Sequence, residues 1–544
     1  MPTDSLRRKS AAIMTAFLIG AAPLTLWPGS AAQAASVSTT TISTPGNPAN
    51  DPQVVVAPNG TATAVWWQND GTYNRIQTAT KPLGGSWGSP TMISPATENA
   101  TGPRLAVAPS GAVTAIWSSY DGAYDRIYVS TRAAGGSWTT PTPLSDPSHD
   151  AADPQIATAS DSSTTVVWRL NTGLYTRVET TTRTAGGTWS PAVILSSAGH
   201  DASYPDVAAS ANGTSSVVWR EHDGSDFIIK ASIRHGNGAW GMAESLSFSG
   251  ASGSTPDVVV APDGTTTVVW RRSDGSNLRI QTNSRPLNGS WTGTTFISDP
   301  GRDAWQPQLA VAPTGTAYAI WRRDDGLVYR AQVSARQANG VWSAPSTLST
   351  GPENAMDPDI AITPDGTAIA VWTQSDGAFT WIQSATKAPS GNWGPATNLS
   401  PTDQRSELAD GAVGLDGTLA VVWRQSSGPP SQATAYVAEG LYKLIPETGA
   451  ITGNRKVTKR SRTFTFTSPD PGVSFQCRVD ATKRRYKVRK KIRKQAVAWQ
   501  PCASPYLVKV GKLKLGRHNL QVRAVFNGVA DPTPTVKVIR YKRK

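Results

Sequence analysis

The chain of 544 residues repeats with a fixed period of 51 residues, and this period constrains its fold more than any other feature. Prolines keep the step, with Ala409 at the eighth position: Pro52, Pro103, Pro154, Pro205, Pro256, Pro307 and Pro358. Tryptophans that end an apolar run keep it too: Trp66, Trp117, Trp168, Trp219, Trp270, Trp321, Trp372 and Trp423. A second tryptophan series follows 21 residues behind the first: Trp87, Trp138, Trp189, Trp240, Trp291, Trp342 and Trp393. One structural unit has therefore been copied eight times.

Within a copy, apolar and polar residues alternate as in β-strands, and no helical periodicity is present. In the fifth copy the pattern predicts strands over 257–260, 265–270, 279–284 and 291–298. Turns are predicted at Pro262-Asp263-Gly264, at Asp274-Gly275 and at Leu287-Asn288-Gly289. A solenoid would also give a fixed period. Four hairpin-linked strands in about 50 residues are, however, typical of a propeller blade.

The two ends of the repeat array predict how the ring closes. The fourth strand of the first seven copies ends in Ile-Ser or Leu-Ser, and Ile42-Ser43 stands 51 residues before the first of these dipeptides. The eighth copy has Ala450-Ile451 at this position. The eighth copy has Leu444 in place of a second-series tryptophan. We therefore expect residues 36–43 to supply the missing fourth strand. The fold class is predicted as all-β, an eight-bladed propeller of 32 strands over residues 36–443, because closure removes two exposed sheet edges.

The 20 tryptophans have two interpretations, as packing between blades and as stacking platforms for sugars. The first series follows runs such as Val268-Val269, which favours packing. The second series follows Gly-Gly-Ser or Asn-Gly, which favours exposure there.

Carboxylates recur at two connections that should lie on one face of the ring. The turn between the second and third strands carries Thr172 and Ser427 in two copies and aspartate in the others: Asp70, Asp121, Asp223, Asp274, Asp325 and Asp376. The connection into the next blade carries Asp150, Asp201 and Asp303. These groups are candidate ligands for a sugar or a cation. The alternative is that Asp-Gly is simply a good turn whose aspartate pairs with the arginine five residues later: Arg75, Arg126, Arg279 or Arg330.

The sequence does not assemble a catalytic centre. An active site needs one copy to depart from the others, and the departures His222, His235, Trp305 and Trp381 are scattered over different copies. The five histidines lack metal-ligand spacing. We predict no catalytic residue, cofactor or metal, and favour a non-enzymatic protein. The alternative is a carbohydrate-active enzyme, a glycosidase or lyase, with its site on the aspartate-rich face.

The N-terminal segment predicts secretion. Arg7, Arg8 and Lys9 precede an apolar run, and small residues ending near Ala35 resemble a cleavage site. Residues 1–35 are therefore expected to be a signal peptide, and an uncleaved anchor or twin-arginine export are the alternatives. No later segment is long and apolar enough to span a membrane. The mature protein is expected to be secreted, with cell-surface association as a further option.

The net charge of +14 hides two opposite parts. Residues 444–544 hold 25 Lys and Arg against 4 Asp and Glu, a net charge of +21, which leaves −7 for the rest. Nine cations are concentrated in twelve residues: Lys483, Arg484, Arg485, Lys487, Arg489, Lys490, Lys491, Arg493 and Lys494. This segment has two interpretations. It is either a solvent-exposed insertion without function, or it retains the protein on a polyanion such as teichoic acid, acidic glycan or extracellular nucleic acid.

Two resemblances add to these predictions. The hairpins at Gly84-Gly85-Ser86-Trp87 and Gly135-Gly136-Ser137-Trp138 resemble the Asp-box hairpins of sialidase-type propellers, although the Asp of the box is missing and the family's catalytic set has no counterpart here. Sialidase activity is therefore not expected.

The C-terminal part resembles the immunoglobulin-like domains that end bacterial, especially actinobacterial, secreted proteins. The segments that match include 463–466, 471–480, 501–506 and 516–524. The resemblance implies a β-sandwich over 461–544, after a linker over 444–460, and a disulfide between Cys477 and Cys502.

These observations together predict a monomeric, secreted, non-catalytic binding protein. Its propeller would present a recognition surface for an extracellular glycan or a surface protein. Its basic tail would act as a tether to an anionic cell-wall polymer or the cell surface.

Overall fold

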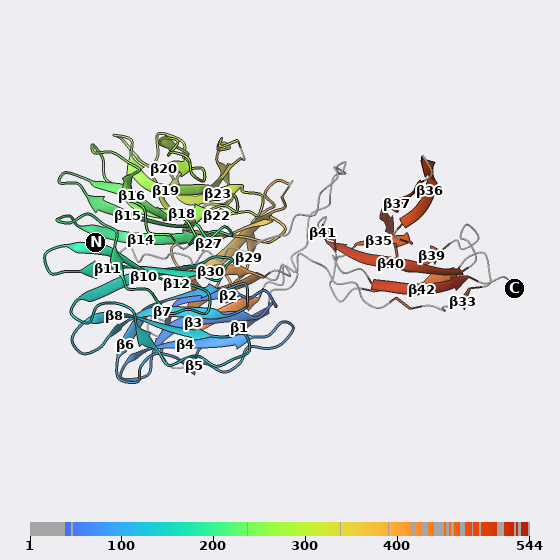
Figure 1. Ribbon diagram of the computed structural model, residues 1–544, viewed down its shortest axis with the longest axis horizontal. Coiled ribbons are helices and arrows are strands. Elements are labelled where there is room, and N and C mark those ends of the chain that lie inside the picture. Colours follow the sequence, from blue (N-terminus) through green and yellow to red (C-terminus); the bar gives the residue numbers. More distant parts are fainter. Residues whose placement is uncertain are drawn as a thin grey trace. The chain divides into compact units, whose positions relative to one another are not determined.

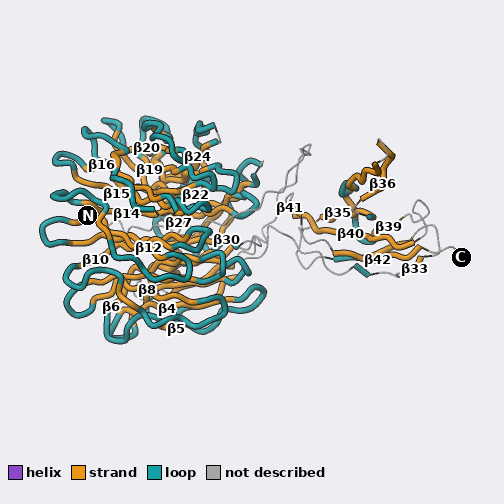
Figure 2. The backbone as a smooth tube through the Cα atoms, viewed as in Figure 1, coloured by secondary structure: helices purple, strands orange, loops and turns teal. Residues whose placement is uncertain are grey.

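The computed structural model describes residues 38–44, 47–236, 238–337, 339–389, 391–414, 419–426, 434–439 and parts of 451–541. Within the C-terminal part these are 451–452, 456–457, 462–467, 474–480, 482–488, 491–508, 516–526, 529–530 and 535–541. The predicted signal peptide, Ser427 and Leu444 lie outside the described residues. The described parts are all-β, with no helix among them (Figure 2). Contacts divide the chain into two units, between Leu441 and Tyr442.

The first unit repeats one arrangement of strands. The first strands of the groups are β2 (Ala49–Val56), β6 (Asn99–Val107), β10 (Asp150–Thr158), β14 (Ala202–Ala209), β18 (Gly253–Val260), β22 (Ala304–Val311), β26 (Asn354–Ile362) and β30 (Arg405–Val413). The second strands are β3 (Ala62–Asn69), β7 (Val113–Tyr120), β11 (Thr164–Asn171), β15 (Ser215–His222), β19 (Thr266–Ser273), β23 (Ala317–Asp324), β27 (Ala368–Ser375) and β31 (Leu419–Ser426).

The third strands are β4 (Asn74–Lys81), β8 (Asp125–Arg132), β12 (Thr176–Arg183), β16 (Phe227–Arg234), β20 (Leu278–Arg285), β24 (Tyr329–Arg336), β28 (Thr380–Lys387) and β32 (Thr434–Glu439). The fourth strands are short: β5 (Thr91–Met92), β9 (Thr142–Pro143), β13 (Val193–Ile194), β17 (Glu244–Ser245), β21 (Thr295–Phe296), β25 (Ser346–Thr347) and β29 (Thr397–Asn398). These strands form six four-stranded sheets and one eight-stranded sheet (Figure 1). Such sheets fit a β-propeller.

The N-terminal strand β1 (Ser38–Thr41) pairs antiparallel with β32, so that Ser38 lies opposite Glu439 and Thr41 opposite Tyr436. This confirms the predicted pairing of the N-terminal segment with the last copy. The eight-stranded sheet contains β26–β29 and the group β30, β31, β32 and β1, joined by one parallel residue pair, Thr380 and Arg405.

The apolar core lies between consecutive sheets. Ala208 and Val218 of the fourth copy pack with Val258, Val268 and Trp270 of the fifth. The same arrangement joins the end of the array to its beginning, where Ala420 and Val422 pack with Val54, Val56 and Trp66. Each sheet therefore buries its faces against its two neighbours, as the alternation of the sequence requires.

The fifth copy shows where the predicted strand limits were wrong. The fourth strand is only Thr295–Phe296 instead of 291–298, and the first begins at Gly253 instead of Asp257. A fourth strand pairs on one side only, so a short one is sufficient. The first strand extends backwards because a β-bulge between Ser254 and Asp257 lets its pairing with β19 resume. The hairpin turn is confirmed, since Gly264 has a φ of 86° and its N–H donates to Ala261 O.

The second unit contains a six-stranded sheet, and the pairs β34–β39 and β36–β37. Its strands are β33 (Lys456–Val457), β34 (Arg462–Phe464), β35 (Ser474–Val479), β36 (Thr482–Val488), β37 (Lys491–Ala496), β38 (Gln500–Cys502), β39 (Tyr506–Val508), β40 (Gly516–Phe526), β41 (Val529–Ala530) and β42 (Thr535–Tyr541). Phe464 and Val508 of the small sheet pack against Leu520, Val522 and Ile539 of the large one. The implied disulfide between Cys477 and Cys502 is confirmed, with a Cα–Cα distance of 5.8 Å.

Candidate functional site

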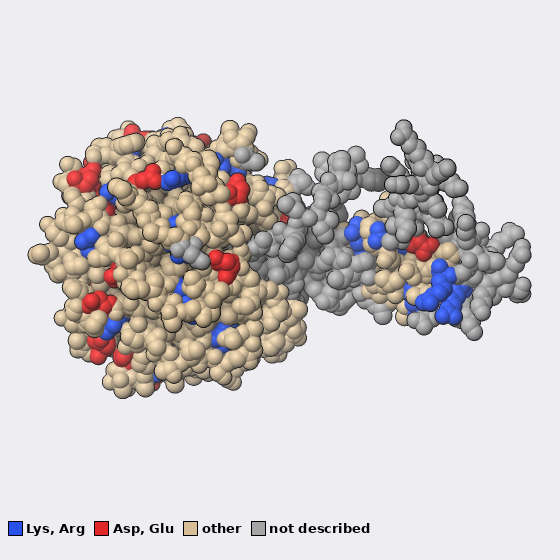
Figure 3. All heavy atoms as spheres, in the orientation of Figure 1, with Lys and Arg blue, Asp and Glu red and all other residues tan. Residues whose placement is uncertain are grey.

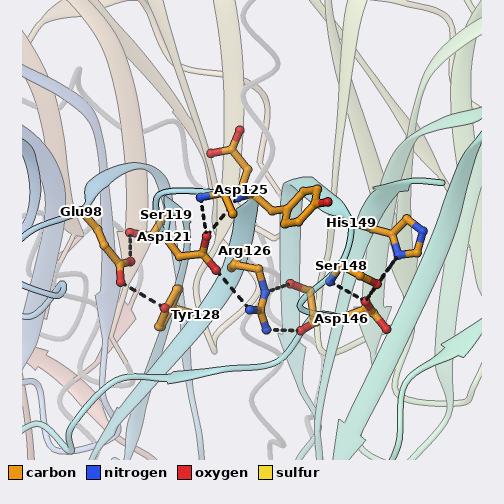
Figure 4. A network of polar contacts seen from close by, with 12 residues as sticks. Glu98, Ser119, Asp121, Asp125, Arg126, Tyr128, Asp146, Ser148 and His149 are labelled. Carbon is orange, nitrogen blue, oxygen red and sulfur yellow. Dashed lines mark hydrogen bonds and ion pairs between the residues drawn. The ribbon is translucent and has the colours of Figure 1, made fainter. Parts of the chain in front are cut away.

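The turn aspartates are hydrogen-bonded within their own turns. Oδ1 of Asp121 accepts hydrogen bonds from the amides of Ala123 and Tyr124, at 2.9 and 3.0 Å, and Oδ2 accepts one from Arg126 at 3.3 Å (Figure 4). The same two backbone hydrogen bonds occur at every turn aspartate: Asp70, Asp121, Asp223, Asp274, Asp325 and Asp376.

These hydrogen bonds determine the charge state of the turns. The backbone amides hold the pKa of all six aspartates below its ordinary value, and that of Asp223 and Asp325 is lowered to about 2. The predicted arginine partners are confirmed in four ion pairs: Arg75–Asp70, Arg126–Asp121, Arg279–Asp274 and Arg330–Asp325. The turn aspartates thus have a structural role. Their role as ligands stays a prediction.

The aspartates of the inter-sheet connections lie beside these turns. Oδ1 of Asp150 accepts a hydrogen bond from the amide of Asp125, at 3.0 Å. Asp201 and Asp303 accept the equivalent bonds from Thr176 and Leu278, at 2.8 and 2.7 Å. The two connections therefore lie on the same face of the first unit, which we call the turn face. Figure 3 shows acidic and basic side chains dispersed over the visible part of this unit.

The two tryptophan series differ in burial. All members of the first series are fully buried, which confirms the packing interpretation. Described members of the second series are half-buried and pack against the rim of the adjacent cores. Arginines cover three of their rings. The guanidinium carbons of Arg132, Arg183 and Arg234 lie 5.2, 5.0 and 5.9 Å from the centroids of Trp138, Trp189 and Trp240.

One Ser–His–Asp cluster occurs on the turn face, and its geometry does not suit catalysis. Ser148 Oγ lies 3.1 Å from His149 Nδ1, and Asp146 Oδ1 lies 3.4 Å from the same nitrogen (Figure 4). A catalytic triad requires the nucleophile and the carboxylate on opposite ring nitrogens. Among the described residues, moreover, no group of three His, Cys, Asp or Glu side chains could hold a metal ion.

A ring of β-bulges surrounds the axis on the turn face. In every copy the residue before the repeated Pro or Ala409 has a positive φ, between 45° and 64°: Asp51, Gly102, Asp153, Tyr204, Thr255, Gln306, Asp357 and Leu408. A non-glycine residue in this region costs about 1 kcal/mol or more, and such strain is concentrated at functional sites. The bulge residues, those before them and their partners on the second strands form what we call the mouth.

The mouth is not eightfold symmetric, because its side chains differ between copies. Carboxylates occupy one part and are paired: Asp51 accepts a hydrogen bond from Trp67 Nε1 at 2.8 Å, and Asp153 binds Arg169 at 2.8 Å. Two further carboxylates are paired in the seventh and eighth copies, where Gln306 donates to Asp357 at 2.9 Å and Arg424 binds Glu407 at 2.6 Å.

Three consecutive copies form the other part of the mouth, which we call the arginine arc. Arg220, Arg271 and Arg322 lie opposite Ser203, Ser254 and Trp305 in the strand register. Aromatic rings accompany the outer two. The Arg220 guanidinium lies 4.1 Å from the ring centroid of Tyr204 and 4.3 Å from that of Phe227, and that of Arg322 lies 5.1 Å from Trp305 and 4.6 Å from Tyr329.

No carboxylate stands at the bulge or the opposing position of these three copies. The three arginines are half-buried. Arg322 Nε is buried and has no hydrogen-bond partner among the described residues. The arginine arc is therefore a partly desolvated cationic surface with aromatic walls, suited to an anionic group.

A second ring of polar residues lies inside the mouth and was missed by the sequence prediction. Its members directly follow the repeated Pro or Ala409: Gln53, Arg104, Gln155, Asp206, Asp257, Gln308, Asp359 and Asp410. Several bind the next first strand, as Asp410 accepts from Val54 N at 2.9 Å and Asp206 from Val258 N at 3.0 Å. Burial lowers the pKa of Arg104, although Asp51 and Asp410 oppose this. The sequence does contain a signal for this inner ring, because each copy has a polar residue at the same position of an otherwise apolar first strand.

This inner ring borders a cavity of about 130 Å³, which is lined by first strands of six copies. The hydrogen bonds from carboxylates to the next strand link neighbouring sheets. We assign the inner ring a structural role.

The basic segment forms a hairpin in the second unit. β36 and β37 pair antiparallel, with Arg484 opposite Lys494 and Arg485 opposite Arg493. Arg489 and Lys490 lie outside the described residues. Cationic residues that oppose each other across two strands are destabilising unless anions neutralise them.

The comparisons with known proteins give distant structural likenesses. No protein-family model matches the chain. No curated protein matches it. A fungal alcohol oxidase of the AA5 family in complex with copper is 12% identical, with a TM-score of 0.43 over 94% of this chain and 100% of the other. The PL25 ulvan lyase is 10% identical, with a TM-score of 0.44 over 74% and 96%.

The β-propeller domain of the Trilobed protease from Pyrococcus furiosus is 10% identical, with a TM-score of 0.40 over 66% and 98%. The propeller class of this chain rests on its own sheet topology. The resemblances to Asp-box repeats and to immunoglobulin-like domains stay predictions.

Proposed function

We propose that this protein binds an anionic glycan at the arginine arc, without cleaving it. The observation that carries the proposal is the clustering of Arg220, Arg271 and Arg322 in three consecutive copies that lack a mouth carboxylate. Carboxylates elsewhere in the mouth are paired, so the arc is the part that attracts a negative ligand. Aromatic rings beside Arg220 and Arg322 offer flat apolar faces for sugar rings.

The proposed architecture is an eight-bladed propeller, completed by β1, followed by an immunoglobulin-like sandwich. Cyclic contacts of the first strands, from β2 to β30 and back to β2, support the blade number. Packing of β34–β39 against the larger sheet supports the sandwich. We further propose that the chain is secreted as a monomer. Among the described residues no helix is long and apolar enough to span a bilayer.

Calorimetric titration with acidic polysaccharides tests the arc. Polygalacturonate should bind, and neutral dextran should not. The variant Arg271→Met should weaken binding at least tenfold, because a charge-assisted contact contributes about 1.5–3 kcal/mol. Arg169→Met is the matched control, since Arg169 has the same strand position but is paired with Asp153. Equal affinity for acidic and neutral polymers would contradict the proposal.

The chain length of the polysaccharide, measured after incubation with the protein, distinguishes binding from catalysis. Unchanged chain length of the bound polysaccharide after prolonged incubation is expected. Shortening of the polymer, abolished by Asp51→Asn or Asp153→Asn, would instead establish the alternative of a carbohydrate-active enzyme.

The basic hairpin is proposed as a tether to an anionic surface polymer. Opposed cations in β36 and β37 support this, because a bound polyanion relieves their repulsion. Deletion of residues 483–494 should abolish retention on teichoic acid, and added salt should weaken retention steeply in the intact chain. Salt-insensitive retention would exclude an electrostatic tether.

A further inference from the structure

A groove of about 910 Å³ opens at the rim between the third and fourth copies, away from the mouth. Trp189 and Trp240 of the second series line it, together with threonine hydroxyls such as Thr182 and with exposed apolar side chains, of which Met242 is 90% exposed. Arg234, at the end of β16, lines it as well.

Arg234 is only 6% exposed, and its Nε and Nη2 atoms have no hydrogen-bond partner among the described residues. These two nitrogens form the side edge of the guanidinium, where two N–H bonds point in parallel. That edge matches the two oxygens of a carboxylate in a bidentate pair. A buried cation with two unused donors is costly unless a ligand satisfies them.

The equivalent arginines show that this arrangement is not part of the repeat. Nη2 of Arg132 donates to Thr63 Oγ1 at 2.6 Å, and Nη1 donates to Thr80. Arg183 uses both terminal nitrogens in the same way, toward Thr131 and Thr114, each at 3.1 Å.

The chain keeps both threonines for Arg234, as Thr182 and Thr165, yet Thr165 donates to Ser215 at 3.4 Å instead. The side edge of Arg234 therefore stays available in this copy alone of the three. Burial also lowers the pKa of Arg234, which agrees with its desolvation.

We propose that this rim groove is a second binding site, specific for a carboxylate-bearing sugar, a uronate. Arg234 binds the carboxylate through Nε and Nη2. The indoles of Trp189 and Trp240 each carry a guanidinium on one side, from Arg183 and Arg234. The indole surface that lines the groove contacts the apolar faces of the sugar rings, and the threonine hydroxyls bind ring hydroxyls. The site is independent of the arginine arc and does not rest on the function proposed for the mouth.

Titration of the full chain with a trigalacturonate tests this site. The experiment uses the background variant Arg271→Met/Arg322→Met, so that failure at the mouth and failure at the rim are distinguishable. We expect one site per chain and at least tenfold weaker binding of the methyl ester, which keeps the sugar and removes the charge. Arg234→Met should weaken acid binding at least tenfold, and Arg234→Lys should restore only part of it, since lysine lacks the parallel donors.

Arg132→Met is the matched control and should leave the affinity within about twofold, because Arg132 is already paired. Thermal melting separates binding from folding: Arg234→Met should keep or raise Tm, whereas Arg132→Met should lower it. Equal affinity for acid and methyl ester, full affinity in Arg234→Met, or tighter binding of a tripeptide carboxylate would overturn the uronate site.

Discussion

Lys230 Nζ lies 2.8 Å from Glu221 Oε1, and both side chains are largely withdrawn from water, with exposures of 16% and 2%. Glu221 also accepts hydrogen bonds from the amide of Ser197 and from Nε1 of the buried Trp219, at 2.9 and 3.0 Å. Burial acts to raise the pKa of Glu221, but the hydrogen bond from Lys230, together with those from Ser197 and Trp219, outweighs it and lowers the pKa. The pair therefore links β15 to β16 as an ionised group.

Lys230→Met should destabilise the first unit by about 2–4 kcal/mol at neutral pH, because Glu221 is left buried without its cation. A group with a lowered folded pKa contributes stability above its unfolded pKa and loses it as the pH falls through the folded pKa. The loss in Lys230→Met should therefore shrink below about pH 4, relative to the native chain. Urea unfolding at pH 7 and pH 3 measures this, and an undiminished loss at pH 3 would contradict it.

The two tryptophan series should differ in their contribution to stability. Trp270 is fully buried, and Trp291 of the same copy is half-buried. Trp270→Ala should cost about 3–5 kcal/mol, and Trp291→Ala less than half of that. Thermal unfolding of both variants gives the comparison. Equal losses would mean that the rim tryptophan packs as tightly as the core one.

The bulge ring predicts an unusual response to glycine. Thr255 is β-branched and has a φ of 48°, so Thr255→Gly should stabilise the chain by roughly 1 kcal/mol. Gly102 occupies the equivalent position with a φ of 61°, and a Cβ there would meet nothing within 4 Å. Gly102→Ala should therefore destabilise through backbone strain alone. Opposite signs in the two melting curves are expected, and a shared sign would refute the strain argument.

The turn aspartates predict an acid-dependent contribution. The amides of Val328 and Leu327 and the Arg330 guanidinium lower the pKa of Asp325 to about 2. Its contribution is therefore present above the unfolded pKa and lost as the pH falls toward 2. Asp325→Asn should lower Tm at pH 7 by roughly 1 °C, since exposed pairs contribute little. The difference should vanish near pH 2, and one that persists there would exclude a charge effect.

Ring closure by β1 can be tested by truncation. Removal of residues 38–43 leaves the outer edge of β32 without its partner strand. Exposed strand edges recruit other chains, so the truncated protein should melt at lower temperature and associate. Size-exclusion chromatography against the intact chain measures this. A truncated protein that stays monomeric with unchanged Tm would show that β1 is dispensable.

The sequence predicted the parts of the fold that repeat. Trp270 and its equivalents marked the second strands, and Gly264 marked a turn. These assignments were possible because the same pattern recurs in eight copies, so that one ambiguous copy does not change the prediction. Residues whose role depends on neighbouring copies were not predictable. The hydrogen bond that Val54 N donates to Asp410 joins the first copy to the last, and no local pattern encodes it. Arg234 and Arg132 occupy equivalent positions, yet their hydrogen bonds differ, which only packing reveals.

The pairing of Ser38 with Glu439 also has a kinetic consequence. Residues 38 and 439 are 401 positions apart in the sequence. The last sheet therefore joins the first strand of the unit, β1, to its last strand, β32. Loop-closure entropy must be overcome before such a contact forms, and distant pairings slow folding. During synthesis, β1 has no partner strand until β32 has left the ribosome. We therefore expect the pairing of β1 with β32 to be the slowest step in folding of the first unit. Until this pairing forms, the open edge of β32 can associate with other chains.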